Sequence, residues 1–250
     1  MIRKALEKGK TIKMLYEATS GNVGIAMACL SNILNIKFKA YIPKPTPSTT
    51  ETLLKILGAE VVRTEHQTID QDMIQMVTRI AESEGAVNLN QYINDANFEI
   101  HLEHTAKEID EQLEVINRKP NVIIAGVGTS GHIAAISARF KSKYGDNVKI
   151  VGVQPAPRNN IPGIKRIETK PKWYFHVKID ELIDITRNEA IEGSILIARR
   201  EGILVGLSSG AVVKAFEKVR DKYGPGVYVL VFPDDGFKYV EIFREFLGEG

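Results

Sequence analysis

Apolar residues in this chain gather in short runs that alternate with longer amphipathic segments. The short runs predict buried strands at 11–16, 38–42, 60–63, 86–89, 122–125, 148–153, 182–185 and 227–232. Between them, apolar residues recur with helical spacing, which predicts helices at 1–7, 23–34, 52–57, 69–84 and 98–113 and further helices after positions 131, 186 and 210. This alternation predicts an α/β fold, in which parallel strands are covered by helices on both faces of the sheet.

Two of the expected helices begin with a capping box, in which a hydroxyl side chain and a glutamate three residues later bond each other's backbone N–H groups. These boxes lie at 48–51 and 186–189. In the helix after position 69, Met73 and Met76 recur with apolar neighbours at the spacing of a half-buried helix. We therefore interpret this methionine stripe as core rather than as a cofactor contact.

The stretch G-V-G-T-S-G at 126–131, here called the glycine loop, joins a buried strand to a helix. Such a turn gathers backbone N–H groups at one point, with the positive end of the helix dipole behind them. Its spacing also matches the dinucleotide pattern G-x-G-x-x-G, which requires an acid at the end of the next strand. That strand ends in Gln154, and Asp146 precedes it. The sequence favours a phosphate-bearing cofactor of another kind, with a purely structural turn as an alternative.

Three other loops of small polar residues follow predicted strands. T-S-G-N at 19–22, here called the carboxylate loop, precedes an almost wholly apolar helix. N-Q-Y-I-N-D-A-N at 90–97 and G-L-S-S-G at 206–210 also lead into helices. Because parallel strands end at one edge of a sheet, we expect these loops to bind an anionic cofactor and an amino or hydroxy acid together with the glycine loop. An ordinary N-cap at 19–22 stays open as an alternative.

Three further features have ordinary explanations. His101 and His104 have i, i+3 spacing without a third ligand nearby, so surface histidines are favoured over a metal site. Cys29 is the only cysteine and lies in an apolar helix, which indicates a buried structural thiol and a reducing compartment such as the cytoplasm. The segment 154–173 has no clear periodicity, and a loop of that length is usually functional or mobile.

The composition argues against several kinds of partner. The chain has 250 residues, 44% of them hydrophobic, so it can bury a substantial core. Its 33 Lys and Arg against 31 Asp and Glu give a net charge of +2, which offers no electrostatic reason to expect nucleic acid or an anionic membrane. No apolar run approaches the ~18 residues of a membrane span, and no secretory leader pattern is recognisable.

Four motifs resemble, in order and spacing, those of the cysteine synthase family of pyridoxal-phosphate enzymes: T-S-G-N, G-V-G-T-S-G, E-G-I-L-V-G-L-S-S-G and P-D-D-G-F-K-Y. N-Q-Y-I-N-D-A-N-F-E and I-P-G-I-K-R-I-E-T are similar to its archaeal O-phosphoserine sulfhydrylase branch. The resemblance covers nearly the whole chain. It implies fold type II, with two open, twisted, mostly parallel sheets covered by helices. It also implies a smaller domain at 18–120 and a larger cofactor domain made of 1–17 and 121–250.

The resemblance assigns a role to residues of each loop. It implies that pyridoxal 5′-phosphate is held through its phosphate by Gly128, Thr129, Ser130, Gly131 and His132. Ser208 would meet the pyridine nitrogen, and Asn22 would bond the ring hydroxyl. The substrate would be held by the carboxylate loop and the following polar loop, at Thr19, Ser20, Gly21, Asn22, Gln91 and Tyr92.

The implied activity is synthesis of L-cysteine from sulfide and O-phosphoserine or O-acetylserine, through an aminoacrylate intermediate. The substrate's phosphate is expected at Lys165, with Arg166 beside it. The archaeal branch is expected to have arginine at 165, and lysine offers a point charge instead of a planar fork, so both substrates stay open. A neutral hydroxyl at Ser208 does not enforce a protonated ring, which suits β-replacement. Relatives are generally homodimers.

The family's Schiff-base lysine stands in an S-x-K-x-R segment that has no match in this sequence, and Lys13 and Lys44 lie in other contexts. The helix at 1–7 has no cap before it and is interpreted as the tail of a longer one. No catalytic residue is therefore identified. Two alternatives stay open: an enzyme whose chain starts further upstream, or a lysine-less relative that binds cofactor and amino acid without turnover. Cystathionine synthesis and serine or threonine deamination are further possible activities.

Overall fold

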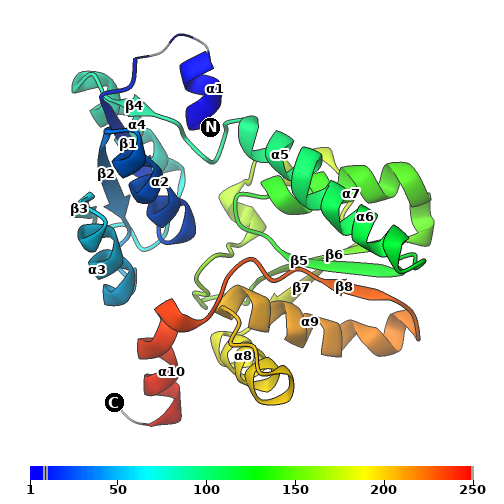
Figure 1. Ribbon diagram of the computed structural model, residues 1–250. Coiled ribbons are helices and arrows are strands. Elements are labelled where there is room, and N and C mark those ends of the chain that lie inside the picture. The colour runs from blue at the N-terminus through cyan, green and yellow to red at the C-terminus, as the bar shows by residue number, and fades with distance from the viewer. Residues whose placement is uncertain (8, 10, 249–250) are drawn as a thin grey trace. The chain divides into compact units, whose positions relative to one another are not determined.

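The computed structural model describes residues 1–7, 9 and 11–248, which form two compact units, one ending at Asn94 and the other beginning at Asp95 (Figure 1). Each unit contains a four-stranded sheet in which all neighbouring strands are parallel. The expected α/β class with two parallel sheets and covering helices is thus confirmed. The domain boundaries expected from the family resemblance, 18–120 and 1–17 with 121–250, stay a prediction.

The first unit has strand order β3-β2-β1-β4. Its elements are α1 (Ile2–Glu7), β1 (Met14–Ala18), α2 (Asn22–Ile33), β2 (Lys37–Ile42), α3 (Ser48–Ile56), β3 (Glu60–Arg63), α4 (Gln71–Ser83) and β4 (Val87–Asn88). Alternate side chains of β1 and β2 face opposite sides of the sheet. Leu15 and Phe38 pack with α1, α2 and α3 on one side, and Tyr16 packs with α4 on the other.

The methionine stripe of α4 faces this core, since Met73 is fully buried among Tyr16, Tyr41 and Val77. The interpretation of Met73 as a core residue is therefore confirmed. The helix begins where Asp70 caps it, because the Asp70 carboxylate accepts a hydrogen bond from the backbone N–H of Met73 at 2.9 Å.

The second unit has strand order β7-β6-β5-β8. Its elements are α5 (Ala96–Ile100), a π-helical turn (His101–Thr105), α6 (Ala106–Val115), β5 (Val122–Gly126), α7 (Gly131–Tyr144), β6 (Lys149–Pro155), β7 (Glu181–Ile185), α8 (Arg187–Glu201), α9 (Leu207–Tyr223), β8 (Tyr228–Leu230) and α10 (Val240–Leu247). The β5 strand is buried along its whole length. Ile123 packs with α6 and α7, whereas Ile124 packs with α8, α9 and α10, so helices cover both faces.

The predicted capping box at 186–189 is present. Thr186 and Glu189 make both reciprocal bonds at the start of α8, as predicted. In the first unit α3 already begins at Ser48, with Pro47 at the cap position, so this helix starts earlier than the predicted range 52–57. The Glu51 carboxylate forms ion pairs with Lys55 and Arg63.

Helix α2 is less buried than its apolar sequence predicts. Cys29 is exposed, so the expectation of a buried thiol was wrong, and Ile33 has 79% of its surface exposed. Only one face of this helix packs against the sheet, through Met27 and Ala28. The continuous helix predicted at 98–113 also differs, because a π-helical turn interrupts it at His101–Thr105.

Candidate cofactor and substrate site

The glycine loop connects β5 to α7 in the second unit. Ser130 occupies the cap position of α7 in the left-handed conformation, with φ of 71°. The backbone N–H of Val127 bonds the Val153 carbonyl at 2.8 Å, which fixes the loop to the end of β6. The first N–H groups of α7 have no partner within the helix, and its dipole places partial positive charge there. The loop is therefore suited to an anion, as its sequence predicts.

Close approach of other chain segments requires glycine at two positions of this loop. A Cβ at Gly128 would lie 2.7 Å from the Gly163 carbonyl oxygen. A Cβ at Gly131 would overlap with the Asn97 side-chain amide. Larger residues would displace either the loop or the segments that contact it.

Ser208 lies near the glycine loop, although about eighty residues separate them in sequence. Ser208 is buried in the first turn of α9, and a Cβ at Gly163 would lie 3.4 Å from its Oγ. Gly163 itself has φ of +91°, which favours glycine there. Gly163 therefore contacts both Gly128 and Ser208, so the structure brings the expected phosphate loop and the expected ring-nitrogen partner into one region of this unit.

The P-D-D-G-F-K-Y motif fixes the start of α9. The Gly206 N–H donates to the Asp234 carbonyl oxygen at 3.0 Å, and the Gly236 N–H donates to that of Leu204 at 3.0 Å. The Asp234 carboxylate in turn accepts a hydrogen bond from Tyr239 at 2.9 Å. This motif holds in place the turn that carries Ser208.

His132, in the first turn of α7, is an uncharged member of the expected phosphate site. Burial lowers its pKa to about 4, and the nearby His101 ring, 5.8 Å away between centroids, contributes to the same lowering. Burial also lowers the pKa of His101, whose Nδ1 lies 2.9 Å from the Thr105 hydroxyl. A neutral His132 can offer one N–H but no positive charge, so the charge of a bound phosphate must be met by backbone N–H groups and the helix dipole.

The two basic residues expected at the substrate's phosphate differ in their surroundings. The Arg166 guanidinium bonds the Glu168 carboxylate at 2.9 Å, the Asp184 carboxylate at 3.3 Å and the Pro155 carbonyl at 2.7 Å. These carboxylates already satisfy its charge, so Arg166 is poorly suited to bind another anion. The Lys165 backbone N–H bonds the Val127 carbonyl at 2.6 Å, which joins its loop to the glycine loop.

The carboxylate loop lies in the first unit, between β1 and α2. Thr19 is buried, and its Oγ1 accepts the backbone N–H of Gly24 at 3.0 Å. Thr19 thus satisfies an N–H of the first turn of α2 from inside the loop. Ser20 and Asn22 are more exposed, and Gly21 occupies the cap position. Thr19 therefore makes a capping-type hydrogen bond although Gly21 occupies the cap position, and Ser20 and Asn22 are the more exposed polar residues of the loop.

Gln91 joins the polar loop at 90–97 to the end of β1. Its amide donates to the Ala18 carbonyl at 2.9 Å, and its backbone N–H donates to Glu17 Oε1 at 3.2 Å. Glu17 is buried, with 1% of its surface exposed, and this burial raises its pKa to about 8 despite hydrogen bonds from Gln91 and Asn90. The Glu17 charge also helps to raise the pKa of Tyr92. Gln91 therefore contacts the end of β1, where the carboxylate loop begins, and the expected role of Gln91 and Tyr92 in lining the substrate pocket stays a prediction.

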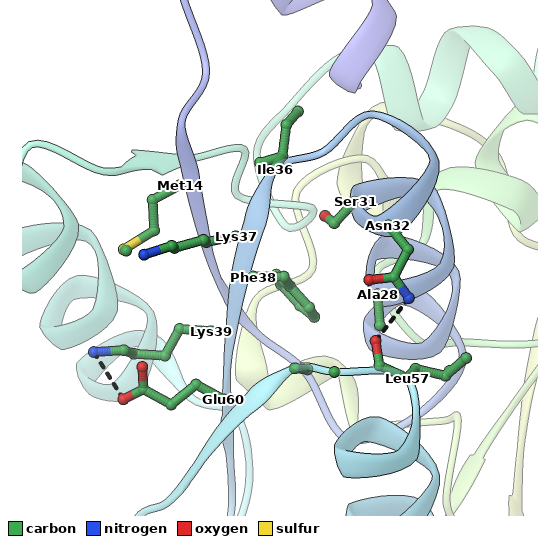
Figure 2. Close-up of a pocket in the computed structure, with 12 residues that line it drawn as sticks. Met14, Ala28, Ser31, Asn32, Ile36, Lys37, Phe38, Lys39, Leu57 and Glu60 are labelled. Atoms are coloured by element: carbon green, nitrogen blue, oxygen red, sulfur yellow. Dashed lines mark hydrogen bonds and ion pairs between the residues drawn. The ribbon is translucent and has the colours of Figure 1, made fainter.

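A separate cavity of about 360 Å³ opens at the other edge of the first unit's sheet. Figure 2 shows it lined by the beginnings of β2 and β3 and by the end of α2, including Lys39, Glu60 and Asn32. The Lys39 ammonium there pairs with Glu60 at 3.0 Å, and the Asn32 amide bonds the Leu57 carbonyl at 2.8 Å. Because the predicted loops follow the carboxyl ends of strands, this cavity is not the site that the sequence predicts.

Comparison with known proteins identifies the family. The pyridoxal-phosphate dependent enzyme family matches residues 1–234. The chain belongs to this family. A cysteine synthase of Aquifex aeolicus is 32% identical over 251 residues, covering 96% of this chain and 76% of that protein. Cysteine synthase B of Escherichia coli is 30% identical over 244 residues, covering 96% and 79%.

Two solved structures agree with the fold. O-ureido-L-serine synthase superposes with a TM-score of 0.83 at 24% identity, covering all of this chain and 82% of that one. A hydrogen sulfide-producing enzyme, solved in complex with an α-aminoacrylate intermediate, gives a TM-score of 0.84 at 27% identity, covering 96% and 76%. The expected fold type II architecture and cysteine synthase family are thereby confirmed, and the cofactor of this family is pyridoxal phosphate.

The second unit contains groups that fit this cofactor. The glycine loop offers N–H groups and close backbone approach to a phosphate, and Ser208 offers a hydroxyl to a ring nitrogen. The neighbouring Ser209 has a buried Oγ for which the described residues provide no hydrogen-bond partner.

Within the described residues, no group of three His, Cys, Asp or Glu side chains could hold a metal ion, and no helix is long and apolar enough to cross a bilayer.

Reasoning from the sequence alone missed two residues beside these loops. Asn97 contacts the glycine loop, and Glu17 contacts Gln91. The signal for Glu17 was available, since a carboxylate in the apolar strand M-L-Y-E-A must be buried or functional. The signal for Asn97 was weak, because polar residues are common throughout 90–97.

Proposed function

We propose that this protein uses pyridoxal phosphate to replace the β-substituent of O-phosphoserine or O-acetylserine with sulfide, which yields L-cysteine. The support comes from its cysteine synthase relatives and from one structural observation, the meeting of Gly128, Gly163 and Ser208. The α-aminoacrylate intermediate bound by one solved relative belongs to that protein and fits the same type of reaction. When bound, the cofactor withdraws electrons from the substrate's α-carbon, so that the β-substituent can leave.

The chain's own residues would bind and orient the reactants. Thr129, Ser130 and the first N–H groups of α7 would hold the cofactor phosphate, with Gly128, Gly131 and His132 packed around it. Ser208 would hydrogen-bond the ring nitrogen. Ser20, Gly21 and Asn22 would bind the substrate carboxylate through the start of α2, while buried Thr19 keeps that turn in shape. Gln91 and Tyr92 would line the pocket, and Asn22 would also contact the cofactor.

The proposal predicts a visible absorption band after incubation with pyridoxal phosphate, and a shift of that band when O-acetylserine or O-phosphoserine is added. With sulfide present, cysteine should accumulate. A protein that stays colourless and forms no cysteine would contradict the proposal. A second outcome is reversible cofactor binding that resists borohydride trapping, with no release of acetate or phosphate. That outcome would favour the alternative of a relative that binds cofactor and amino acid without turnover.

The choice between the two substrates should depend on Lys165. Replacing Lys165 with Ala is expected to weaken affinity for O-phosphoserine roughly tenfold or more, because a charged contact to phosphate is lost. Affinity for O-acetylserine should change less than about twofold, since acetate ester oxygens carry no charge. Titration calorimetry with each amino acid measures both values. Lys165→Arg, which keeps the charge, is the matched control, and equal losses for both substrates would contradict the assignment.

The homodimeric state, cytoplasmic location and archaeal branch expected from the sequence remain parts of this proposal. Arg166 is not proposed to bind the phosphate of O-phosphoserine, because its guanidinium already pairs with Glu168 and Asp184. Cystathionine synthesis would be detected as cystathionine formed when homocysteine replaces sulfide in the assay. Deamination of serine or threonine would be detected as release of a keto acid in the absence of sulfide.

A further inference from the structure

Asn97 connects the start of α5 to the glycine loop within the second unit. Its side-chain Nδ2 donates to Thr129 Oγ1 at 2.9 Å. On its other side, the Asn97 amide packs so closely on Gly131 that a Cβ there would overlap with it. One amide therefore contacts both the apex of the glycine loop and the first residue of α7.

This contact determines the direction of the Thr129 hydroxyl. A threonine hydroxyl has one hydrogen to donate and two lone pairs that accept. Because Asn97 donates to Thr129 Oγ1, one lone pair is used and the hydroxyl hydrogen must point to a different acceptor. A phosphate oxygen bound in the glycine loop is such an acceptor.

The neighbouring hydroxyl is held by different groups. Ser130 Oγ accepts backbone N–H groups from Trp173 and Tyr174, each at 3.1 Å, and Ser130 is completely buried. Ser130 therefore anchors the 173–174 turn with its side chain. Thr129 is partly exposed, so its side chain is more accessible to a ligand than that of buried Ser130.

We propose that Asn97 is a positioning residue that directs the Thr129 hydroxyl toward the phosphate of the bound cofactor. The inference rests on the proposed function, because it assumes that the glycine loop binds this phosphate. The Asn97 side-chain amide, which comes from α5, determines the direction in which the Thr129 hydroxyl donates its hydrogen. Asn97 thereby contributes to discrimination between phosphorylated and unphosphorylated ligands without contacting either.

The test compares pyridoxine 5′-phosphate with pyridoxine, two probes that lack the aldehyde and cannot form a Schiff base with any lysine. The chain has one tryptophan, and Trp173 is bonded to the glycine loop through Ser130, so its fluorescence reports on this site. The full chain is titrated with each probe. Inorganic phosphate serves as a competitor.

In Asn97→Asp the new side chain has nearly the same shape as asparagine. Its carboxylate carries a negative charge and, instead of donating to Thr129 Oγ1, would accept the hydrogen of the Thr129 hydroxyl. We expect it to weaken pyridoxine 5′-phosphate binding roughly 10- to 100-fold, while pyridoxine binding changes less than about threefold. Asn97→Ala, which removes the donor without adding charge, should also weaken pyridoxine 5′-phosphate binding selectively. In a Thr129→Val background much of this Asn97→Ala effect should disappear, because the two residues act through one hydrogen bond. Asn147→Asp, which adds the same charge at the opposite end of α7, is the matched control and should change neither affinity.

The outcomes separate this inference from the proposed function. If the unmodified protein prefers pyridoxine 5′-phosphate over pyridoxine but Asn97→Asp keeps that preference, only the role of Asn97 is overturned. Equal weakening of both probes, with an unchanged melting temperature, would also overturn it. If the unmodified protein shows no preference for the phosphorylated probe, the glycine loop is not a phosphate site and both proposals fail.

Discussion

Replacing Glu17 with Gln is expected to raise the free energy of unfolding at pH 8 by roughly 4 kcal/mol, since the pKa of the Glu17 carboxyl differs by more than three units between the folded and unfolded protein and one unit corresponds to ~1.4 kcal/mol. Glu17 is buried in β1, and burial raises the pKa of its carboxyl from 4.5 to about 8. Its Oε1 accepts the Gln91 N–H, whereas the described residues provide no partner for its Oε2. Glutamine keeps the accepting oxygen and removes the cost of burying a charge.

The sign of the effect follows from the two pKa values. Below about pH 4.5 the carboxyl is protonated in both the folded and the unfolded protein, so the full stability is present. As the pH rises from there toward about 8, ionisation is favourable only in the unfolded chain, and stability is lost. The free energy of unfolding should therefore fall across this range in the unmodified protein, and the fall should be much smaller in Glu17→Gln.

Urea denaturation from pH 5 to pH 9, followed by circular dichroism, measures this difference. Glu82→Gln, at an exposed position of α4, is the matched control and should leave the pH dependence unchanged. Parallel pH profiles for Glu17→Gln and the unmodified protein would contradict the prediction. Because Glu17 holds Gln91 beside the carboxylate loop, the same series with added O-acetylserine reports whether its ionisation loosens the substrate loops.

The sequence was sufficient for the class of fold and for the positions of the loops. Apolar runs such as 122–125 are buried whatever their partners, so periodicity alone locates the strands. Alternation of strands and helices then implies parallel pairing, and parallel pairing places the loops of small residues at one edge of each sheet. The glycine loop and the start of α9 could be recognised in this way before any coordinates.

The side-chain contacts could not be predicted in the same way, because they depend on tertiary packing. Arg166 was expected beside the substrate's phosphate, but in the structure its guanidinium forms ion pairs with Glu168 and Asp184. Cys29 lies in an apolar helix, yet only one face of that helix packs against its sheet. The role of Asn97 depends on a distance to Thr129, thirty-two positions away, that no local pattern encodes.

The contact between α8 and α9 should be very sensitive to an added methyl group. Gly210→Ala is expected to lower the free energy of unfolding by about 3 kcal/mol, because overpacking of this kind costs several kcal/mol when backbone atoms must move. A Cβ at Gly210 would lie closer than 3.0 Å to the Ala190 carbonyl oxygen and to the Ser194 side chain. In an uncrowded helix the same change would stabilise by ~1 kcal/mol through helix propensity, so the sign of the result is decisive.

The separation of the two helices would also affect the cofactor site. Ser194 Oγ donates to the Gly206 carbonyl at 3.0 Å, and Gly206 is the cap residue immediately before Leu207 and Ser208. Moving α8 away from α9 should therefore weaken both stability, measured by thermal unfolding, and pyridoxine 5′-phosphate affinity, measured by Trp173 fluorescence. Glu192→Ala, on the exposed side of α8, is the matched control and should change stability by less than about 0.5 kcal/mol. A higher melting temperature for Gly210→Ala would mean that helix propensity outweighs the clash and that the two helices pack less closely than their glycines indicate.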